Sequence, residues 1–139
     1  MKSFIKVISS ILIAAVVLSA CAMTPRVSSW ESPQGFTKEQ VFNAAIQAGG
    51  QNGMKTTASD RESGTMSFSK AIGEGDMILS AQIAEANGIV NVQTTGNFAG
   101  RIALAGLHEE VINNFHVLLF RNLKISDPAA KNVRIEVLK

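Results

Sequence analysis

Side chains able to carry out chemistry are few and widely spaced in this sequence of 139 residues. The two histidines, His108 and His116, are eight residues apart, about 12 Å along a helix, so they cannot bind one metal ion together. The residue four positions after His108 is Ile112, which excludes the two-histidine helix of zinc proteases. We interpret both histidines as hydrogen-bonded residues at the boundary of the core.

The remaining polar patterns do not suggest catalysis either. Asp60 and Glu62 are close in sequence, but no basic or second acidic cluster accompanies them, so a solvated loop is the better interpretation. The segment Gly73-Glu74-Gly75 lacks the third glycine and the following helix of a dinucleotide-binding loop. A single cysteine cannot form an internal disulfide or a cysteine-based zinc site. We therefore expect a protein that is not an enzyme and that uses no metal or cofactor.

The first twenty residues have the pattern of a secretory signal. Lys2 and Lys6 give a positive start, and Ile11–Leu18 is an unbroken apolar run. This run is shorter than the roughly 20 residues that a helix needs to cross a bilayer. A signal peptide over residues 1–20 that is removed is therefore favoured over a membrane anchor that is kept.

The end of this segment, Leu18-Ser19-Ala20-Cys21, resembles the lipobox of bacterial lipoproteins. The resemblance implies cleavage between Ala20 and Cys21 and attachment of lipid to the Cys21 thiol and to the new amine. Several acyl chains together give a stable membrane anchor. Ala22 after the cysteine resembles the signal for the outer membrane in enterobacterial sorting, which implies a domain in the periplasm.

The charge of the mature chain is close to zero. Of the 13 Lys and Arg residues, Lys2 and Lys6 belong to the signal, which leaves 11 basic against 11 acidic residues. A neutral domain lacks the electrostatic attraction that nucleic-acid binding requires. We therefore expect no nucleic-acid partner.

Residues 21–35 are predicted to be the lipid-bearing cysteine and a tether. Pro25, Pro33, Gly35 and three serines oppose regular structure in this stretch. Fully extended, the tether would reach roughly 45–50 Å. Trp30, the only tryptophan of the chain, either docks onto the domain or acts as an anchor for an interface or partner.

Residues 36–139 are predicted to be a single α+β domain. Thr37 and Gln40 have the spacing of a capping box at the start of a helix, which Gly49-Gly50 is expected to end. The Asn87-Gly88 pair predicts a two-residue β-turn. Four strands are expected, over residues 54–60, 65–71, 77–86 and 89–99.

The turn also predicts the register of its hairpin. If Ala86 pairs with Ile89, then Ile83 faces Val92 and Met77 faces Phe98, which places apolar residues together on one side. A long amphipathic helix is expected to follow to about residue 123, and a short strand over 133–137 ends the chain. The predicted fold is an antiparallel sheet of four to five strands with two helices on one face, in the order α-β-β-β-β-α(-β).

One small apolar patch on the last helix is not explained by this fold. Val117 and Phe120 lie nearly opposite the buried side of the helical wheel. We expect them, with Trp30, to contact an envelope protein or a second copy of the chain. The alternative is that the final strand folds over them.

The segments Phe36–Phe42 and Ser59–Met66, the second with a Ser-Asp-x-Glu-x-Gly hairpin, are similar to the helix-grip domains of the lipoprotein in the outer-membrane β-barrel assembly machinery. The chain also resembles small uncharacterised lipoproteins. The similarity covers about 30 of the 119 residues that follow the cleavage site. That family has two such domains and a long tether, whereas this chain has one domain and a short tether. The resemblance implies no catalytic residues.

Two functions remain open at this point. The first is a non-enzymatic envelope lipoprotein that holds or assists a protein partner at the periplasmic face of the outer membrane. The alternative is a carrier that holds a small apolar ligand between sheet and helices, in a groove lined by Met54, Met66 and Met77. A cavity above about 300 Å³ between the last helix and the sheet would favour the carrier, and a filled core would favour the partner.

The lipobox leads to a direct prediction. The substitution Cys21→Ser removes the thiol that accepts lipid, so the variant should remain an uncut precursor in the inner membrane. Radiolabelled palmitate should enter the parent protein but not the variant. Incorporation into the variant would contradict the lipobox assignment.

Overall fold

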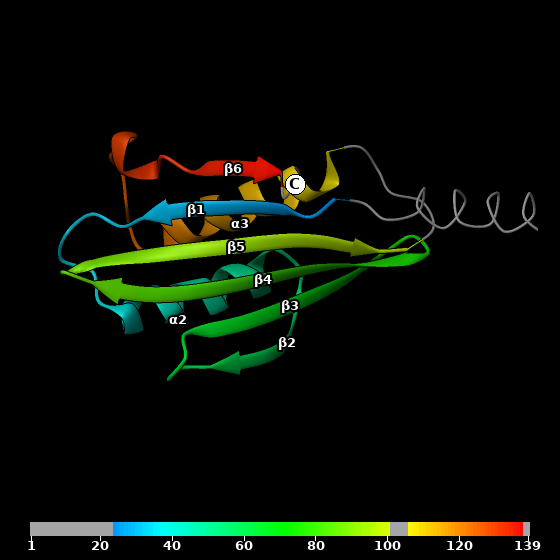
Figure 1. Ribbon diagram of the computed structural model, residues 1–139, viewed down its shortest axis with the longest axis horizontal. Coiled ribbons are helices and arrows are strands. Elements are labelled where there is room, and N and C mark those ends of the chain that lie inside the picture. The colour runs from blue at the N-terminus through cyan, green and yellow to red at the C-terminus, as the bar shows by residue number, and fades with distance from the viewer. Residues whose placement is uncertain (1–23, 101–105, 138–139) are drawn as a thin grey trace, which may run out of the picture.

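The structure is a computed structural model that describes residues 24–100 and 106–137 (Figure 1). The elements follow one another as β1 (Arg26–Glu31), α2 (Lys38–Gln51), β2 (Lys55–Asp60), β3 (Thr65–Ile72), β4 (Gly75–Ala86), β5 (Ile89–Ala99), α3 (Leu107–Asn122), the 3-10 helix η1 (Ala129–Lys131) and β6 (Arg134–Val137). The predicted signal peptide, Ala20 and Cys21 lie outside the described residues. Within those residues, none of the helices has the length and apolar character to cross a membrane.

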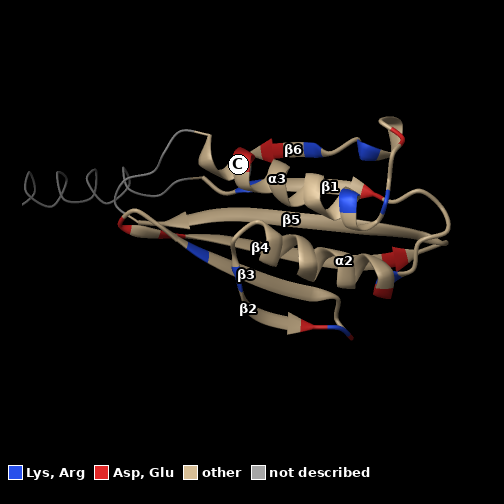
Figure 2. Cartoon of the chain, turned by 180° about the vertical axis from the view of Figure 1, so that it is seen from behind, with Lys and Arg blue, Asp and Glu red and all other residues tan. Residues whose placement is uncertain are grey.

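All six strands form one antiparallel sheet in the order β2-β3-β4-β5-β1-β6. Both helices cover the same face of this sheet, as the two opposite views in Figures 1 and 2 show. The apolar side chains of the strands and helices meet between these two layers. The predicted α+β class, antiparallel sheet and one-sided helices are confirmed, and the sheet has one strand more than expected.

The additional strand is β1, so the tether prediction is wrong for residues 26–31. Strand β1 pairs with β5 through six residue pairs and with β6 through four. Its inward positions are Ser28 and Trp30, both buried. Because only one of these two side chains is apolar, the segment lacks the alternation by which a strand is usually found. Its hydrogen bonds to two neighbouring strands compensate for that weak pattern.

Trp30 is part of the core, with only 1% of its surface exposed. Its ring lies 5.1 Å from the ring of Phe120, measured between centroids. The indole Nε1 donates a hydrogen bond of 2.6 Å to the carbonyl oxygen of Ala130. The prediction that Trp30 contacts a partner is therefore wrong, and its alternative, docking onto the domain, is confirmed.

The β4–β5 hairpin confirms the register predicted from its turn. Ala86 pairs with Ile89, Ile83 with Val92, and Met77 with Phe98. Asn87 and Gly88 have φ angles of 53° and 76°, as a type I′ turn requires at both central positions.

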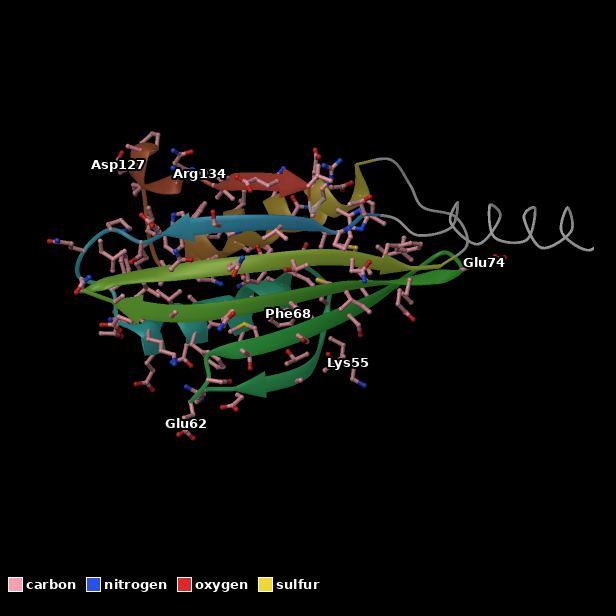
Figure 3. All side chains as sticks on the ribbon, in the orientation of Figure 1. Lys55, Glu62, Phe68, Glu74, Asp127 and Arg134 are labelled. Atoms are coloured by element: carbon pink, nitrogen blue, oxygen red, sulfur yellow. The ribbon has the colours of Figure 1, made fainter. Side chains whose placement is uncertain are left out.

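Helix α2 begins at its predicted capping box but continues beyond the predicted end. The Thr37 side chain accepts a hydrogen bond from the Gln40 backbone, and the Gln40 side chain accepts one from Thr37. The helix runs through Gly49 and Gly50 to Gln51. The reason is packing, because a Cβ atom at Gly49 would lie 2.2 Å from the Phe68 ring, which β3 places below the helix (Figure 3). Gly49 therefore allows α2 to approach the sheet closely.

Helix α3 is buried over a wider part of its surface than the helical wheel suggests. Phe120 is only 5% exposed because Trp30 covers it, whereas Val117 is 55% exposed. The expectation that Phe120 lies open to solvent is thus wrong, and the partner contact stays a prediction that rests on the exposed Val117. The first part of the expected helix, residues 101–105, lies outside the described residues.

The space between the helices and the sheet is filled by side chains. Met54, Met66 and Met77 are all buried and belong to the core cluster. They therefore pack against apolar neighbours and do not line an open groove. This observation removes the basis for a ligand chamber at these three methionines.

The two neighbouring glycines of α2 provide a matched pair for a stability test. Gly49→Ala should lower the free energy of unfolding by about 1–3 kcal/mol, because the new methyl group displaces the Phe68 ring. A methyl group at Gly50 would meet no atom of the described residues within 4 Å, so Gly50→Ala should raise stability by roughly 0.5–1 kcal/mol. Urea denaturation of both variants measures the difference. Equal effects would contradict the close packing of α2 on β3.

Candidate binding groove beside helix α3

A buried polar cluster connects α3 to two neighbouring strands of the sheet, β1 and β5. The sheet register places Ser28 of β1 directly opposite Thr94 of β5, and both side chains point toward the helices. The two hydroxyl groups are hydrogen-bonded to each other. The Nε2 atom of His116 lies 2.9 Å from the Ser28 Oγ and 3.2 Å from the Thr94 Oγ1. Three elements are thus joined by one set of side-chain hydrogen bonds.

His116 is held in its neutral form by this environment. Burial lowers its pKa from 6.5 to about 4, because a charged imidazole would lose its hydration there. Its Nδ1 atom has no hydrogen-bond partner among the described residues. The expectation of a boundary histidine is wrong for this residue, which is only 2% exposed.

His108 is also more deeply buried than predicted. It is 3% exposed, and its Nε2 atom has no hydrogen-bond partner among the described residues. Burial lowers its pKa, and the positive charge of Arg26 adds to this effect. Arg26 itself forms an ion pair with Glu109, with 3.5 Å between the charged atoms, and so joins the start of β1 to the start of α3.

The contact between Ser28 and His116 has the distance of a nucleophile and its general base. However, Ser28 has no exposed surface, so a substrate on the protein surface does not reach its hydroxyl group. Among the described residues, no group of three or more His, Cys, Asp or Glu side chains is placed to hold a metal ion. The cluster therefore acts here as a connection within the core.

An open groove lies beside this cluster, between α3 and the segment that leads into β6. It has a volume of about 710 Å³. Its α3 side is formed by Asn113, His116, Val117 and Phe120, and its other side by Pro128, Ala129, Lys131, Asn132 and Val133. Local sequence patterns do not reveal this groove, because its second wall is a loop held in place by the buried Trp30.

A second hollow of about 530 Å³ continues from the first toward the C-terminal end of α3. The two share Val117, Phe120 and Lys131, so we treat them together as the α3 groove. The second part is also lined by Arg121, Lys124, Ile125 and Ser126. Figure 2 shows that basic residues gather at the end of α3 and in the segment leading into β6. The α3 groove is therefore uncharged at one end and positive at the other.

The predicted contact residues have different places in this groove. Val117 lines both of its parts and is exposed, whereas Phe120 lines both parts from a buried position. Trp30 supports the loop wall through its bond to Ala130 and is absent from the lining of both parts. Ala20 and Cys21 lie outside the described residues.

Comparison with known proteins gives a likeness of fold. No protein-family model and no curated protein sequence matches the chain. The crystal structure of Ara h 8.0201 is similar, with a TM-score of 0.52 and 10% identity, over 72% of this chain and 99% of that chain. An uncharacterised protein from Bacillus thuringiensis has a TM-score of 0.45 and 17% identity, over 78% of this chain and 99% of that chain. The likeness to Ara h 8.0201 agrees with the α+β fold of a sheet and helices.

The buried imidazole predicts a specific dependence of stability on pH. The unfolded chain binds a proton at His116 near pH 6.5, whereas the folded chain binds it only near pH 4. Stability should therefore fall as the pH is lowered from 6.5 to 4, by roughly 3 kcal/mol from this residue, and change little from this residue below pH 4.

The variant His116→Phe provides the control, because it cannot take up a proton and leaves Ser28 and Thr94 bonded to each other. Urea denaturation of parent and variant across this pH range isolates the effect from that of His108 and the carboxylates. Parallel curves for the two proteins would show that His116 is not buried in its neutral form.

Proposed function

We propose that this protein is a non-enzymatic lipoprotein of the bacterial cell envelope, anchored through Cys21, whose domain binds another molecule along the α3 groove. The lipobox supports the anchor. The observation that carries the binding role is the exposed Val117 in a groove that also contains Phe120 and Val133. The volumes of its two parts fall within the range of about 300–1,000 Å³ that is typical of ligand sites.

The position of β1 brings this groove close to the proposed anchor. Only residues 22–25 separate Cys21 from the first residue of the strand. Five extended Cα steps reach at most about 18 Å, far less than the tether predicted from composition. The Arg26–Glu109 pair places the start of β1 beside the start of α3, and the uncharged end of the groove begins further along this helix, at Asn113. With Cys21 as the proposed anchor, we expect the uncharged end of the groove to be the end nearer the membrane.

A protein partner is the second candidate for the occupant. Val117 is one of the large apolar residues that the described chain leaves exposed, and an envelope protein or a second copy would cover it. A carrier with its ligand inside the core is less well supported, because Met54, Met66 and Met77 are packed in the core.

Thiol protection tests whether the groove is occupied in the envelope. A Val117→Cys variant should react with a water-soluble maleimide at least fivefold more slowly in isolated envelopes than after purification into phosphatidylcholine vesicles. The matched control is Asn114→Cys, on the same helix, exposed and absent from the lining of the α3 groove, which should react equally in both settings. The parent chain measures any reaction of Cys21 itself.

Equal reaction of Val117→Cys in envelopes and in vesicles would mean that the groove is empty in its native setting, and the proposed binding role would then be wrong. Reaction of the parent chain at Cys21 would instead contradict the proposed lipid anchor.

A further inference from the structure

We propose that the α3 groove binds a single acyl chain with an anionic headgroup, and that Arg121, Lys124 and Lys131 hold the headgroup. This inference rests on the proposed function, because it names the ligand of the same groove. It follows from the distribution of charge along the groove, from the arrangement of the three cations and from the backbone of Lys124.

Charge and apolar surface are separated along the groove. Lys131 lines both parts, while Arg121 and Lys124 line only the part at the C-terminal end of α3. The other end is formed by uncharged residues, among them Asn113, His116 and Val133. From Asn113 to Lys124 the helix rises about 17 Å, which gives the approximate length of the groove. A molecule with one charged end and a long apolar body matches this arrangement.

The three cations are available to a ligand. The ion pairs found among the described residues join Arg26 to Glu109 and Arg61 to Glu39, and neither uses a cation of the groove. The nearest acid in sequence, Asp127, accepts a hydrogen bond of 2.9 Å from the backbone nitrogen of Ala129, two residues further along the chain. Its position at the turn before β6 is shown in Figure 3.

The helix end does not cancel this positive charge. The C-terminus of a helix carries a partial charge of about −0.5, which Arg121 and Lys124 adjoin. Together with Asp127 this gives about −1.5 against three positive charges, so the end of the groove stays positive. Balancing the partial negative charge of the helix end alone would not require three positively charged side chains.

Lys124 occupies a backbone position that normally favours glycine. Its φ angle is 56°, in the left-handed region, and it follows the C-cap residue of α3, Leu123. Its backbone nitrogen bonds to the Arg121 oxygen at 3.1 Å, and that of Ile125 bonds to the Phe120 oxygen at 2.9 Å. Glycine or asparagine is usual where a helix ends in this way. A lysine here costs backbone strain, which is common at binding sites.

A single anionic head fits these observations better than an acidic peptide. Two of the three cations, Arg121 and Lys124, line only one end of the groove, whereas a peptide with several acidic residues would require positive charge along its whole length. A second copy of the chain would have to present acidic residues beside an apolar segment to the same end. The anchored acyl chains of the surrounding membrane are also the chemistry that lies nearest to a domain held at its surface.

The test uses the full-length anchored protein in phosphatidylcholine vesicles, which contain no anionic lipid. The probes are dodecanoate with a photoactivatable group at the end of its chain and the uncharged dodecanol with the same group. After irradiation, peptide mapping should find the dodecanoate label on residues 113–116, 128–129 or 132–133, which contain the residues that line only the uncharged part of the groove. Dodecanol should label these residues at least threefold less.

Two variants test whether labelling depends on the headgroup site itself. They exclude a loss of labelling that is caused by lower stability or by the removal of any one positive charge. Lys124→Gly should lower dodecanoate labelling at least threefold while its melting temperature equals or exceeds that of the parent, because glycine accepts the left-handed backbone. The matched control Lys55→Gln changes an exposed lysine on β2, at the opposite edge of the sheet from β6 (Figure 3), and should leave labelling unchanged.

Equal labelling by dodecanoate and dodecanol, or full labelling of Lys124→Gly, would overturn the anionic headgroup but leave the proposed function intact. Competition by a poly-glutamate peptide but not by unlabelled dodecanoate would replace the acyl ligand by an acidic peptide. A dimer of the parent protein that Lys124→Gly dissociates, measured by native mass spectrometry of the detergent-solubilised chains, would replace it by a second copy. Failure of the proposed function itself is detected separately, by the maleimide reaction of Val117→Cys, which does not depend on charge.

Discussion

The arrangement of the domain depends on the burial of one side chain, Trp30. Its ring packs on Phe120 of α3, and its indole N–H bonds to Ala130 of η1. A tryptophan is the largest apolar side chain, and its N–H group needs a partner when it is buried. Both needs are met only if β1, α3 and η1 are held together. The loop that η1 begins then forms the second wall of the α3 groove.

Most of the fold follows from local patterns in the sequence. The capping box at Thr37, the Asn87-Gly88 turn and the alternation along β4 and β5 depend on residues close in the chain, and the structure agrees with them. Strand β1 has no such local signal, because Ser28 faces a hydrogen-bonding partner, His116, that lies 88 residues away. Polar residues can occupy inward positions when distant polar partners are present, and no local pattern reveals such partners.

Because local patterns do not reveal contacts between distant residues, the groove can be predicted from the sequence only in part. A helical wheel assumes that a helix is buried on one side, but α3 contacts the sheet, α2 and the loop beyond its own end. The wheel places Phe120 at the surface although it is buried, and it places Val117, one turn away, correctly on the exposed side. The three cations of the groove come from α3 and from the loop after it, and only the path of that loop brings Lys131 beside Val117.

The core that stabilises the domain and the groove proposed for binding lie in different parts of the fold. The buried apolar side chains of the described strands and helices form one core cluster between the two layers. The α3 groove lies outside this core and is open to solvent, and a ligand can enter it without movement of the sheet.

The strand that follows the proposed anchor is well suited to resist force from the membrane. Strand β1 is hydrogen-bonded on both sides, to β5 and to β6, and tension along it would have to break both ladders together. Its far end is fixed by Trp30, and the backbone of Ser32 bonds to Val90 at 2.8 Å just beyond the strand. Under the proposed anchoring at Cys21, this position between two neighbouring strands would keep the wall of the groove that Trp30 supports at a constant place relative to the membrane.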